Sequence, residues 1–247
     1  APLGEGVAVR TSCWRTLHFR PASSAILGSM RVLITGASGG LGAAVVEQFL
    51  AEGCQVAGVA RSWTECDERF QRISADLTSE EGSARAVAEA GPVDALVHVL
   101  GGFAGGEPVA TASQLEWDRM LKLNLGAAFH SFRAVLPGML ERRRGRIIAV
   151  GSRAGVEPVA GLSAYGVSKA GLVHLVRTLA LELKDTGVTA NIVLPSIIDT
   201  AANRAAMPGA DASKWVQPES IAKVVSWLAS DGARDINGAV IPVYGEA

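Results

Sequence analysis

Short apolar runs alternate with helical patterns along most of this chain, and the alternation restricts the folds open to it. The runs are apolar throughout, which is typical of parallel strands buried on both faces. Strands are predicted at 31–35, 55–60, 72–75, 94–100, 145–150, 188–194 and 239–243. Helices are predicted at 41–52, 79–90, 113–141, 164–185 and 218–229. Repeats at this spacing build right-handed βαβ units. We therefore predict an α/β protein with a single doubly wound Rossmann domain, whose seven-stranded, mostly parallel sheet carries helices on both faces.

The length of 247 residues suits one large domain, to which we assign residues 30–247. Residues 1–29 differ in composition, because they contain Arg10, Arg15 and Arg20 but a single acid. We predict that they form an N-terminal extension outside the fold, either an upstream segment or a cloning remnant. An organellar presequence is the alternative.

The charge balance argues against several classes of partner. The chain has 23 basic and 24 acidic residues spread along its length, so it has no excess positive charge that would attract nucleic acid or an anionic membrane. No apolar stretch reaches the ~20 residues that cross a bilayer, so no membrane partner is expected. Four scattered histidines lack metal-ligand spacing, so no metal site is expected. Three cysteines without a Cys-x-x-Cys pair favour free thiols and a cytoplasmic location.

A glycine-rich turn, Thr35-Gly36-x-x-x-Gly40-x-Gly42, joins the first predicted strand to the first helix. Phosphate groups bind backbone N–H groups at helix N-termini, and glycines keep side chains out of that approach. Between a strand and a helix, the turn predicts a dinucleotide site, with a merely tight turn as the alternative. The residues expected to contact the dinucleotide here are Gly36, Ser38, Gly39, Gly40, Leu41 and Gly42.

Arg61 and Ser62 stand at the end of the second predicted strand, where proteins that bind NAD usually carry an acid. An acid repels a 2′-phosphate, whereas an arginine can form two charge-assisted hydrogen bonds with it. We therefore predict NADP(H) as the cofactor. The alternative is a surface arginine beside a cofactor that other contacts hold.

Asp76 and Leu77 follow the third predicted strand, in the region that would flank the adenine. Asp76 can accept a hydrogen bond from the adenine amino group while Leu77 packs against the ring. The alternative for Asp76 is an acid at a helix N-terminus, because Thr78 and Ser79 begin the next helix.

A serine, a tyrosine and a lysine form the predicted reactive centre. Ser152 ends a buried strand at the sheet edge where α/β proteins bind ligands, and Tyr165 and Lys169 share one helix face. Hydride delivery to a carbonyl carbon leaves negative charge on the oxygen, which a phenol can protonate. A neighbouring ammonium is expected to bring the pKa of that phenol nearer to working pH. Ser152 can hydrogen-bond the same oxygen.

In these motifs residues 31–247 resemble the short-chain dehydrogenase/reductase family, and within it the 3-oxoacyl-carrier-protein reductases. The resemblance adds Asn124, within Lys122-Leu-Asn-Leu-Gly126, as a fourth catalytic residue whose helix kink holds a proton-relay water. Apolar helices around 129–140 and 172–183 form dimer or tetramer interfaces in the family, so a homo-oligomer is expected. The positions that the resemblance places at the nicotinamide half of the cofactor are Gly101, Tyr165, Lys169, Pro195, Ile198 and Thr200.

The chain departs from the family pattern at two positions. His98-Val99-Leu100-Gly101 stands where the family usually has Asn-Asn-Ala-Gly, and Pro195-Ser196 stands where it has Pro-Gly. We predict that His98 is a core histidine, with a catalytic histidine as the alternative. A short loop over 201–217 is expected to line the substrate pocket with its large side chains, Met207 and Trp215.

The leading hypothesis is an oxidoreductase that reduces a small-molecule carbonyl, or oxidises the alcohol, with 3-oxoacyl thioesters as first candidates. Residues 99–106 and 194–208 also resemble dihydropteridine reductases, although those enzymes typically carry an acid after the second strand and lack the catalytic serine. Reduction of a quinonoid dihydropteridine is therefore one alternative. A catalytically silent dinucleotide-binding module is another, and the intact Ser–Tyr–Lys–Asn set argues against it.

Overall fold

The computed structural model describes residues 30–63 and 67–246. Seven strands form one sheet in the order β3-β2-β1-β4-β5-β6-β7, and every neighbouring pair is parallel. The strands are β1 (Arg31–Thr35), β2 (Gln55–Ala60), β3 (Gln71–Ser74), β4 (Ala95–His98), β5 (Gly145–Val150), β6 (Val188–Pro195) and β7 (Val240–Val243). The predicted α/β architecture is confirmed, with a sheet that is parallel throughout. The extension predicted at 1–29 lies outside the described residues.

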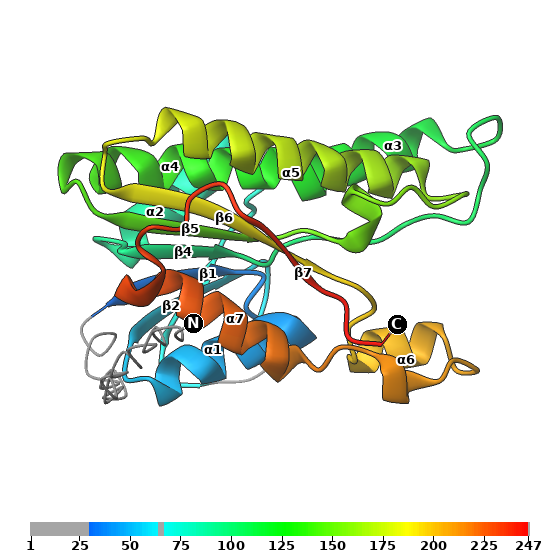
Figure 1. Ribbon diagram of the computed structural model, residues 1–247, viewed down its shortest axis with the longest axis horizontal. Helices are drawn as coiled ribbons and strands as arrows, with labels where there is room; N and C mark the ends of the chain where they lie inside the picture. Colours follow the sequence, from blue (N-terminus) through cyan, green and yellow to red (C-terminus); the bar gives the residue numbers. More distant parts are fainter. Residues whose placement is uncertain (1–29, 64–66, 247) are drawn as a thin grey trace, which may run out of the picture.

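Helices cover both faces of the sheet. The main helices are α1 (Gly40–Ala51), α2 (Glu80–Ala90), α3 (Gln114–Met120), α4 (Ala127–Glu141), α5 (Ser163–Glu182), α6 (Ala201–Ala206) and α7 (Pro218–Ala229). Short 3-10 turns are η3 (Arg153–Gly155), η4 (Ala212–Lys214) and η5 (Asp231–Ala233). Helices α2, α4 and α5 lie on one face and α1 and α7 on the other, so the molecule has three layers (Figure 1). Within the described ranges, no helix is long and apolar enough to cross a membrane.

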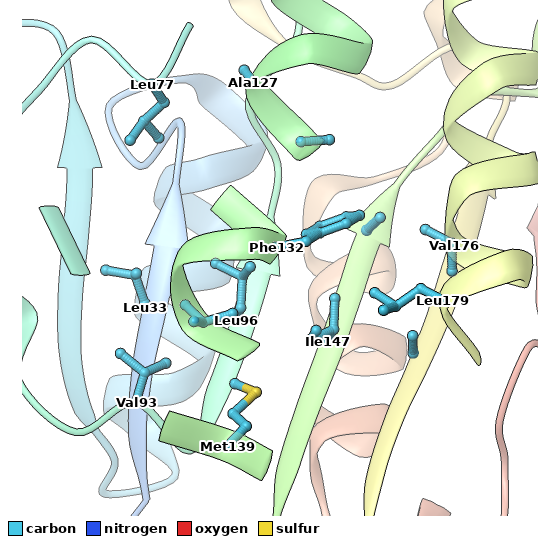
Figure 2. Packing of buried hydrophobic residues seen from close by; sticks show 14 of the residues in the cluster. Leu33, Leu77, Val93, Leu96, Ala127, Phe132, Met139, Ile147, Val176 and Leu179 are labelled. Carbon is cyan, nitrogen blue, oxygen red and sulfur yellow. The ribbon is translucent and has the colours of Figure 1, made fainter. Parts of the chain in front are cut away.

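Each face of the sheet has its own apolar core. Strands β5 and β6 are buried along their whole length, as expected for strands covered on both sides. On the α4–α5 face, Leu33, Leu96 and Ile147 of the sheet pack with Phe132 and Val176 of the helices (Figure 2). The core on the other face includes Val32, Ile34, Phe49, Val97 and Val225.

The strand order reverses beside β1. From β1 the chain moves outward through β2 to β3, and it then returns to place β4 on the other side of β1. Thr35, the last residue of β1, is level with Val59 of β2 and His98 of β4. Open α/β sheets bind ligands at the carboxyl ends of the strands at such a reversal.

The helix predicted over 113–141 is confirmed, and a π-helical segment in its middle gives the kink expected near Asn124. Leu121–Gly126 form a π-helical segment (η2) between α3 and α4. A π-helical turn accommodates an additional residue, and the apolar periodicity used to predict helices does not mark it. Asn124 lies in this segment and is buried.

The strand predicted over 94–100 is too long, because β4 ends at His98. The N–H of Leu100 donates to the Thr35 hydroxyl, and the N–H of Gly102 donates to Asn124 Oδ1. Side chains therefore take the backbone hydrogen bonds that a longer strand would have made with its neighbours.

Candidate active site

Close backbone contacts shape the glycine-rich turn after β1. Gly36 has a positive φ of 68°, and a Cβ atom built on it would lie 2.9 Å from Leu100 Cα. A Cβ atom on Gly42 would overlap the carbonyl oxygen of Gly36. Side chains are therefore excluded at these two positions, which lets the turn fold back tightly at the carboxyl end of β1.

Helix α1 begins directly behind this turn, with Gly39 as its N-cap residue and no acid in its first turn. Ser38, Gly39 and Gly40 are exposed, while Leu41 and Gly42 are buried. In the part of the chain that the structure describes, no side chain caps the positive end of the α1 dipole. The turn is therefore suited to an anionic group such as a pyrophosphate.

Arg61 and Ser62 follow β2 and are exposed. Hydrogen bonds from Thr78 lower the pKa of the Asp76 carboxyl, and the positive charges of Lys122 and Arg61 lower it further. Arg61 therefore lies within electrostatic reach of Asp76, since the parallel strands β2 and β3 end side by side. The residues predicted to contact the 2′-phosphate and the adenine thus share one edge of the sheet.

The side chains of Asp76 and Leu77 make contacts within the protein that the sequence analysis does not predict. Asp76 Oδ1 accepts hydrogen bonds from the N–H and the hydroxyl of Thr78, at 3.0 and 2.8 Å. The N-cap of α2 is Ser79, so the alternative of a capping aspartate is not met. Leu77 is 4% exposed and packs in the core (Figure 2). Little of its side chain is therefore open to an adenine ring, and the contact of Leu77 with the adenine stays a prediction.

Ser152, Tyr165 and Lys169 come together at the carboxyl end of β5. Ser152 follows this strand, and Tyr165 and Lys169 lie one helical turn apart on α5. The hydroxyl of Ser152 is near enough to that of Tyr165 to lower its pKa by hydrogen bonding, and it also accepts a hydrogen bond from the N–H of Ala154 at 3.2 Å. The buried Lys169 ammonium donates a hydrogen bond to the Val150 carbonyl oxygen at 3.1 Å.

Burial dominates the protonation of this centre. It raises the pKa of Tyr165, and the hydrogen bond with Ser152 offsets that rise only in part. Burial also lowers the pKa of Lys169 to about 8. The expected lowering of the Tyr165 pKa by Lys169 is not seen, because loss of solvation disfavours the charged form of both groups. The phenol is therefore a proton donor at neutral pH.

Asn124 connects the segment after β4 to the helix that carries Tyr165. Its Oδ1 accepts from the N–H of Gly102 at 2.8 Å, and its Nδ2 donates to the Gly102 carbonyl at 3.1 Å. Nδ2 also donates to the Ser168 hydroxyl at 2.9 Å, which donates to the Tyr165 carbonyl. A Cβ atom on Gly101 would lie about 3 Å from both Asn124 Oδ1 and Lys169 Nζ. The absence of a side chain at Gly101 lets its backbone enter between these two residues.

His98 is a core histidine, as predicted, but its Nε2 has no hydrogen-bond partner among the described residues. Its Nδ1 is hydrogen-bonded to the Thr35 hydroxyl at 3.1 Å, and its ring packs edge to face on Phe132. Burial lowers the pKa of His98 to about 3, and the charge of Lys169 contributes to that shift. His98 is therefore neutral at physiological pH and ties the end of β4 to the end of β1.

The segment after β6 reaches the glycine-rich turn. Pro195 ends β6, Ile198 forms an isolated parallel bridge with Val216, and Thr200 caps α6. A Cβ atom on Gly40 would lie 3.0 Å from Thr200 Cγ2. Of the residues that the resemblance places near the nicotinamide, Thr200 therefore lies against the start of α1.

The segment 201–217 is not the loop that the sequence suggested, because it contains α6 and η4. Trp215 is buried, so it does not line an open pocket as expected. Met207 is half-buried. Arg204 forms a bidentate ion pair with Asp199, which holds α6 to the segment before it.

No sequence pattern predicts the contact of Phe103 with Tyr165. The two rings pack edge to face with their centroids 5.0 Å apart. Phe103 stands between Gly101-Gly102 and Gly105-Gly106, and a lone aromatic among glycines is the signal that could have marked it. Within the described residues no group of potential metal ligands is found. The site thus combines a proton donor, a hydroxyl partner and a buried amine at the edge that also holds an anion-binding turn.

The chain is similar in sequence to known proteins over most of its length. The family described as short chain dehydrogenase matches residues 30–210. An acetoacetyl-CoA reductase of Allochromatium vinosum is 32% identical over 86% of this chain and 96% of its own length. The 3-oxoacyl-[acyl-carrier-protein] reductase FabG of Escherichia coli is 32% identical over 86% of this chain and 95% of its own.

Among solved structures, a blue fluorescent protein from a metagenomic library, in complex with NADPH, is 30% identical. It superposes with a TM-score of 0.80 over 89% of this chain and 98% of its own. The family match covers most of the chain, and the fold agrees. The protein therefore belongs to the short-chain dehydrogenase family and is an oxidoreductase.

Proposed function

We propose that this enzyme transfers a hydride between NADP(H) and a carbonyl or alcohol substrate. The observation that carries the proposal is the convergence of Ser152, at the end of β5, with Tyr165 on α5. This pair lies above the buried Lys169, at the same sheet edge as the glycine-rich turn after β1. A proton donor beside a dinucleotide site is what the reduction of a carbonyl requires.

The residues present fit a nicotinamide dinucleotide. A Cβ atom at Gly36 or Gly42 would fill the turn, and the uncapped start of α1 suits the pyrophosphate. When bound, the nicotinamide supplies or accepts the hydride. The exposed Arg61, with no acid at the end of β2, supports NADP(H) over NAD(H), as does the complex of the similar blue fluorescent protein with NADPH.

The side chains of the site have separate roles in the reaction. In the reduction direction Tyr165 donates its proton to the substrate oxygen, and Ser152 hydrogen-bonds the same oxygen. Lys169 would hold the nicotinamide half of the cofactor, as the resemblance implies, with the positive charge that it carries below about pH 8. Asn124 positions the backbone of Gly102 and, through Ser168, that of Tyr165. The water that the resemblance assigns to Asn124 stays a prediction.

The substrate class follows from the similar proteins. Those reported above are named as reductases of acetoacetyl-CoA and of 3-oxoacyl-[acyl-carrier-protein], both 3-oxoacyl thioesters. We therefore take 3-oxoacyl thioesters as the first candidates.

The test is NADPH oxidation with a panel of 3-oxoacyl thioesters, quinones, pterins and sugars. We expect turnover of at least one carbonyl class by the wild type, and a loss of about a thousandfold for Tyr165→Phe. Binding of NADPH, followed by its fluorescence, should stay within about twofold in that variant because the pyrophosphate contacts are intact. Unchanged turnover by Tyr165→Phe would remove Tyr165 as the proton donor.

A cytoplasmic homo-oligomer is part of the same proposal. Phe129 and Leu140 on α4 and Leu181 on α5 are exposed apolar residues on the outer face of the molecule. Such residues are typical of a subunit interface. Light scattering of the purified chain would decide between a dimer, a tetramer and a monomer.

A further inference from the structure

Phe103 projects a large apolar side chain beside the proposed proton donor. Its ring packs on Tyr165 at 5.0 Å between centroids and at an interplanar angle of 67°, yet Phe103 remains 64% exposed. One edge of the phenyl ring is thus held by Tyr165 while most of its surface faces solvent. Covering that surface with an apolar group is favourable, by roughly 25 cal/mol per Å².

The segment that carries Phe103 is held at both ends. The backbone N–H and carbonyl groups of Gly102 are both bonded to Asn124. The N–H of Gly106 donates to the carbonyl of Gly161 at 2.8 Å. Phe103 therefore has a defined place at the site, because hydrogen bonds on either side fix its backbone.

The glycines of this segment allow it to lie close to its neighbours. A Cβ atom on Gly102 would lie 2.7 Å from Leu123 Cδ2, and one on Gly105 would overlap the side chain of Leu162. The segment therefore presses against the helix that holds Asn124 and against the segment before α5. Phe103 is the one large side chain between Gly101 and Gly106.

Exposed apolar residues and acidic residues lie on the segments next to the one that carries Phe103. Val156 and Val159 are exposed on the segment between Ser152 and Gly161, which the Gly106 hydrogen bond joins to the Phe103 segment. Glu107 and Glu116 line a cavity of about 140 Å³ next to Ser163 and Ala164, just before Tyr165. None of the described residues that line this cavity is basic, but Glu116 is paired with Arg119 at 2.9 Å, so Glu107 supplies the unbalanced negative charge. An acidic substrate group would be repelled here, whereas a hydrocarbon group would cover Phe103.

We propose that Phe103 is a specificity-determining residue that binds an uncharged hydrocarbon substituent of the substrate, close to the reacting carbonyl. The preferred substrates are then carbonyl compounds with an alkyl or aryl chain, and those with an acidic group beside the carbonyl are disfavoured. This inference rests on the proposed function, since it concerns the substrate of the same site.

The test is a comparison of kcat/KM for methyl ketones of increasing alkyl length, with 2-oxo acids of matching length, all reduced with NADPH. For the wild type we expect kcat/KM to rise about threefold with each added methylene group. Phe103→Ala should lose about tenfold for the longest ketone and less than about twofold for the shortest. The KM for NADPH should not change.

Two further variants make the test specific. Phe103→Leu should keep most of the dependence on chain length, because leucine still offers apolar surface. Trp227→Ala is the control, since Trp227 is also an exposed large apolar residue but lies on α7, which covers the other face of the sheet (Figure 1). It should behave as the wild type.

The possible results separate this inference from the proposed function. An equal loss for every ketone in Phe103→Ala would mean that Phe103 only braces Tyr165, and it would overturn the inference alone. An unchanged dependence on chain length, or wild-type reduction of 2-oxo acids as fast as of ketones, would do the same. A wild type that binds NADPH but reduces no carbonyl compound would overturn the proposed function, and the inference with it.

Discussion

The buried ammonium of Lys169 donates a hydrogen bond to the carbonyl oxygen of Val150, the last residue of β5, at 3.1 Å. This contact attaches the start of α5 to the sheet directly below Ser152 and Tyr165. It also places a positive charge where water cannot solvate it, and burial therefore lowers the pKa of Lys169 to about 8.

A dependence of activity on pH follows from the low pKa of Lys169. Below about pH 8 Lys169 is charged and can hold the nicotinamide half of the cofactor, whereas above that pH it becomes neutral. We expect kcat/KM for carbonyl reduction to fall as pH rises through about 8. In Lys169→Arg the fall of kcat/KM above about pH 8 should be absent, because arginine stays charged. The same fall of kcat/KM with rising pH in the arginine variant would show that another group titrates.

The hydroxyl of Ser152 is predicted to act on both Tyr165 and the substrate oxygen. Its hydrogen bond lowers the pKa of Tyr165 against the effect of burial, so Ser152→Ala should raise that pKa. We expect kcat to fall by about a hundredfold, with little change in the KM for NADPH. Ser152→Thr keeps a hydroxyl and should retain more activity than Ser152→Ala. Equal activities for the two variants would argue against a role of the hydroxyl.

Arg61 is predicted to select the phosphorylated cofactor. Arg61→Asp replaces a positive charge by a negative one at the end of β2, and should raise the KM for NADPH by about a hundredfold. The KM for NADH should change much less, because NADH lacks the 2′-phosphate. Arg234→Asp is the control, since Arg234 is an exposed arginine next to η5. Equal changes in both KM values for Arg61→Asp would count against the assignment.

The turn after β1 is predicted to tolerate no side chain at its last glycine. Gly42→Ala places a methyl group on the carbonyl oxygen of Gly36, so the turn must open and NADPH binding should be lost. The free energy of unfolding should fall by about 2 kcal/mol or more. Gly209→Ala is the matched control, because a Cβ atom there meets nothing within 4 Å. Wild-type NADPH binding by Gly42→Ala would show that this turn does not hold the cofactor.

Predictions from local sequence hold best where local forces decide the structure. The bounds predicted for β1, β2 and β5 agree with the structure, because continuous apolar runs identify strands buried on both faces. The end of β4 was predicted two residues too far, since Val99 and Leu100 are as apolar as the strand before them. Only the contacts of the Thr35 hydroxyl and Asn124 with the following backbone end the strand.

For the candidate site, too, local sequence predicts some features, and contacts between distant segments decide the others. The spacing of Tyr165 and Lys169 predicts that they share a helix face, and the turn from Gly36 to Gly42 predicts an anion site. The direction of the Tyr165 pKa shift was predicted wrongly, because it depends on burial by residues distant in the chain. The core position of the Leu77 side chain depends on packing between elements in the same way.

The sequence by itself determines the doubly wound sheet, the glycine-rich turn and the Tyr–Lys pair, because apolar periodicity, glycine backbone freedom and helical spacing act over a few residues. The tertiary structure alone decides how Asn124 joins Gly102 to Ser168, how far the pKa of Lys169 falls, and that Phe103 lies on Tyr165. These features arise from contacts between segments far apart in the chain and from loss of water around charged groups, which neighbours in sequence do not control.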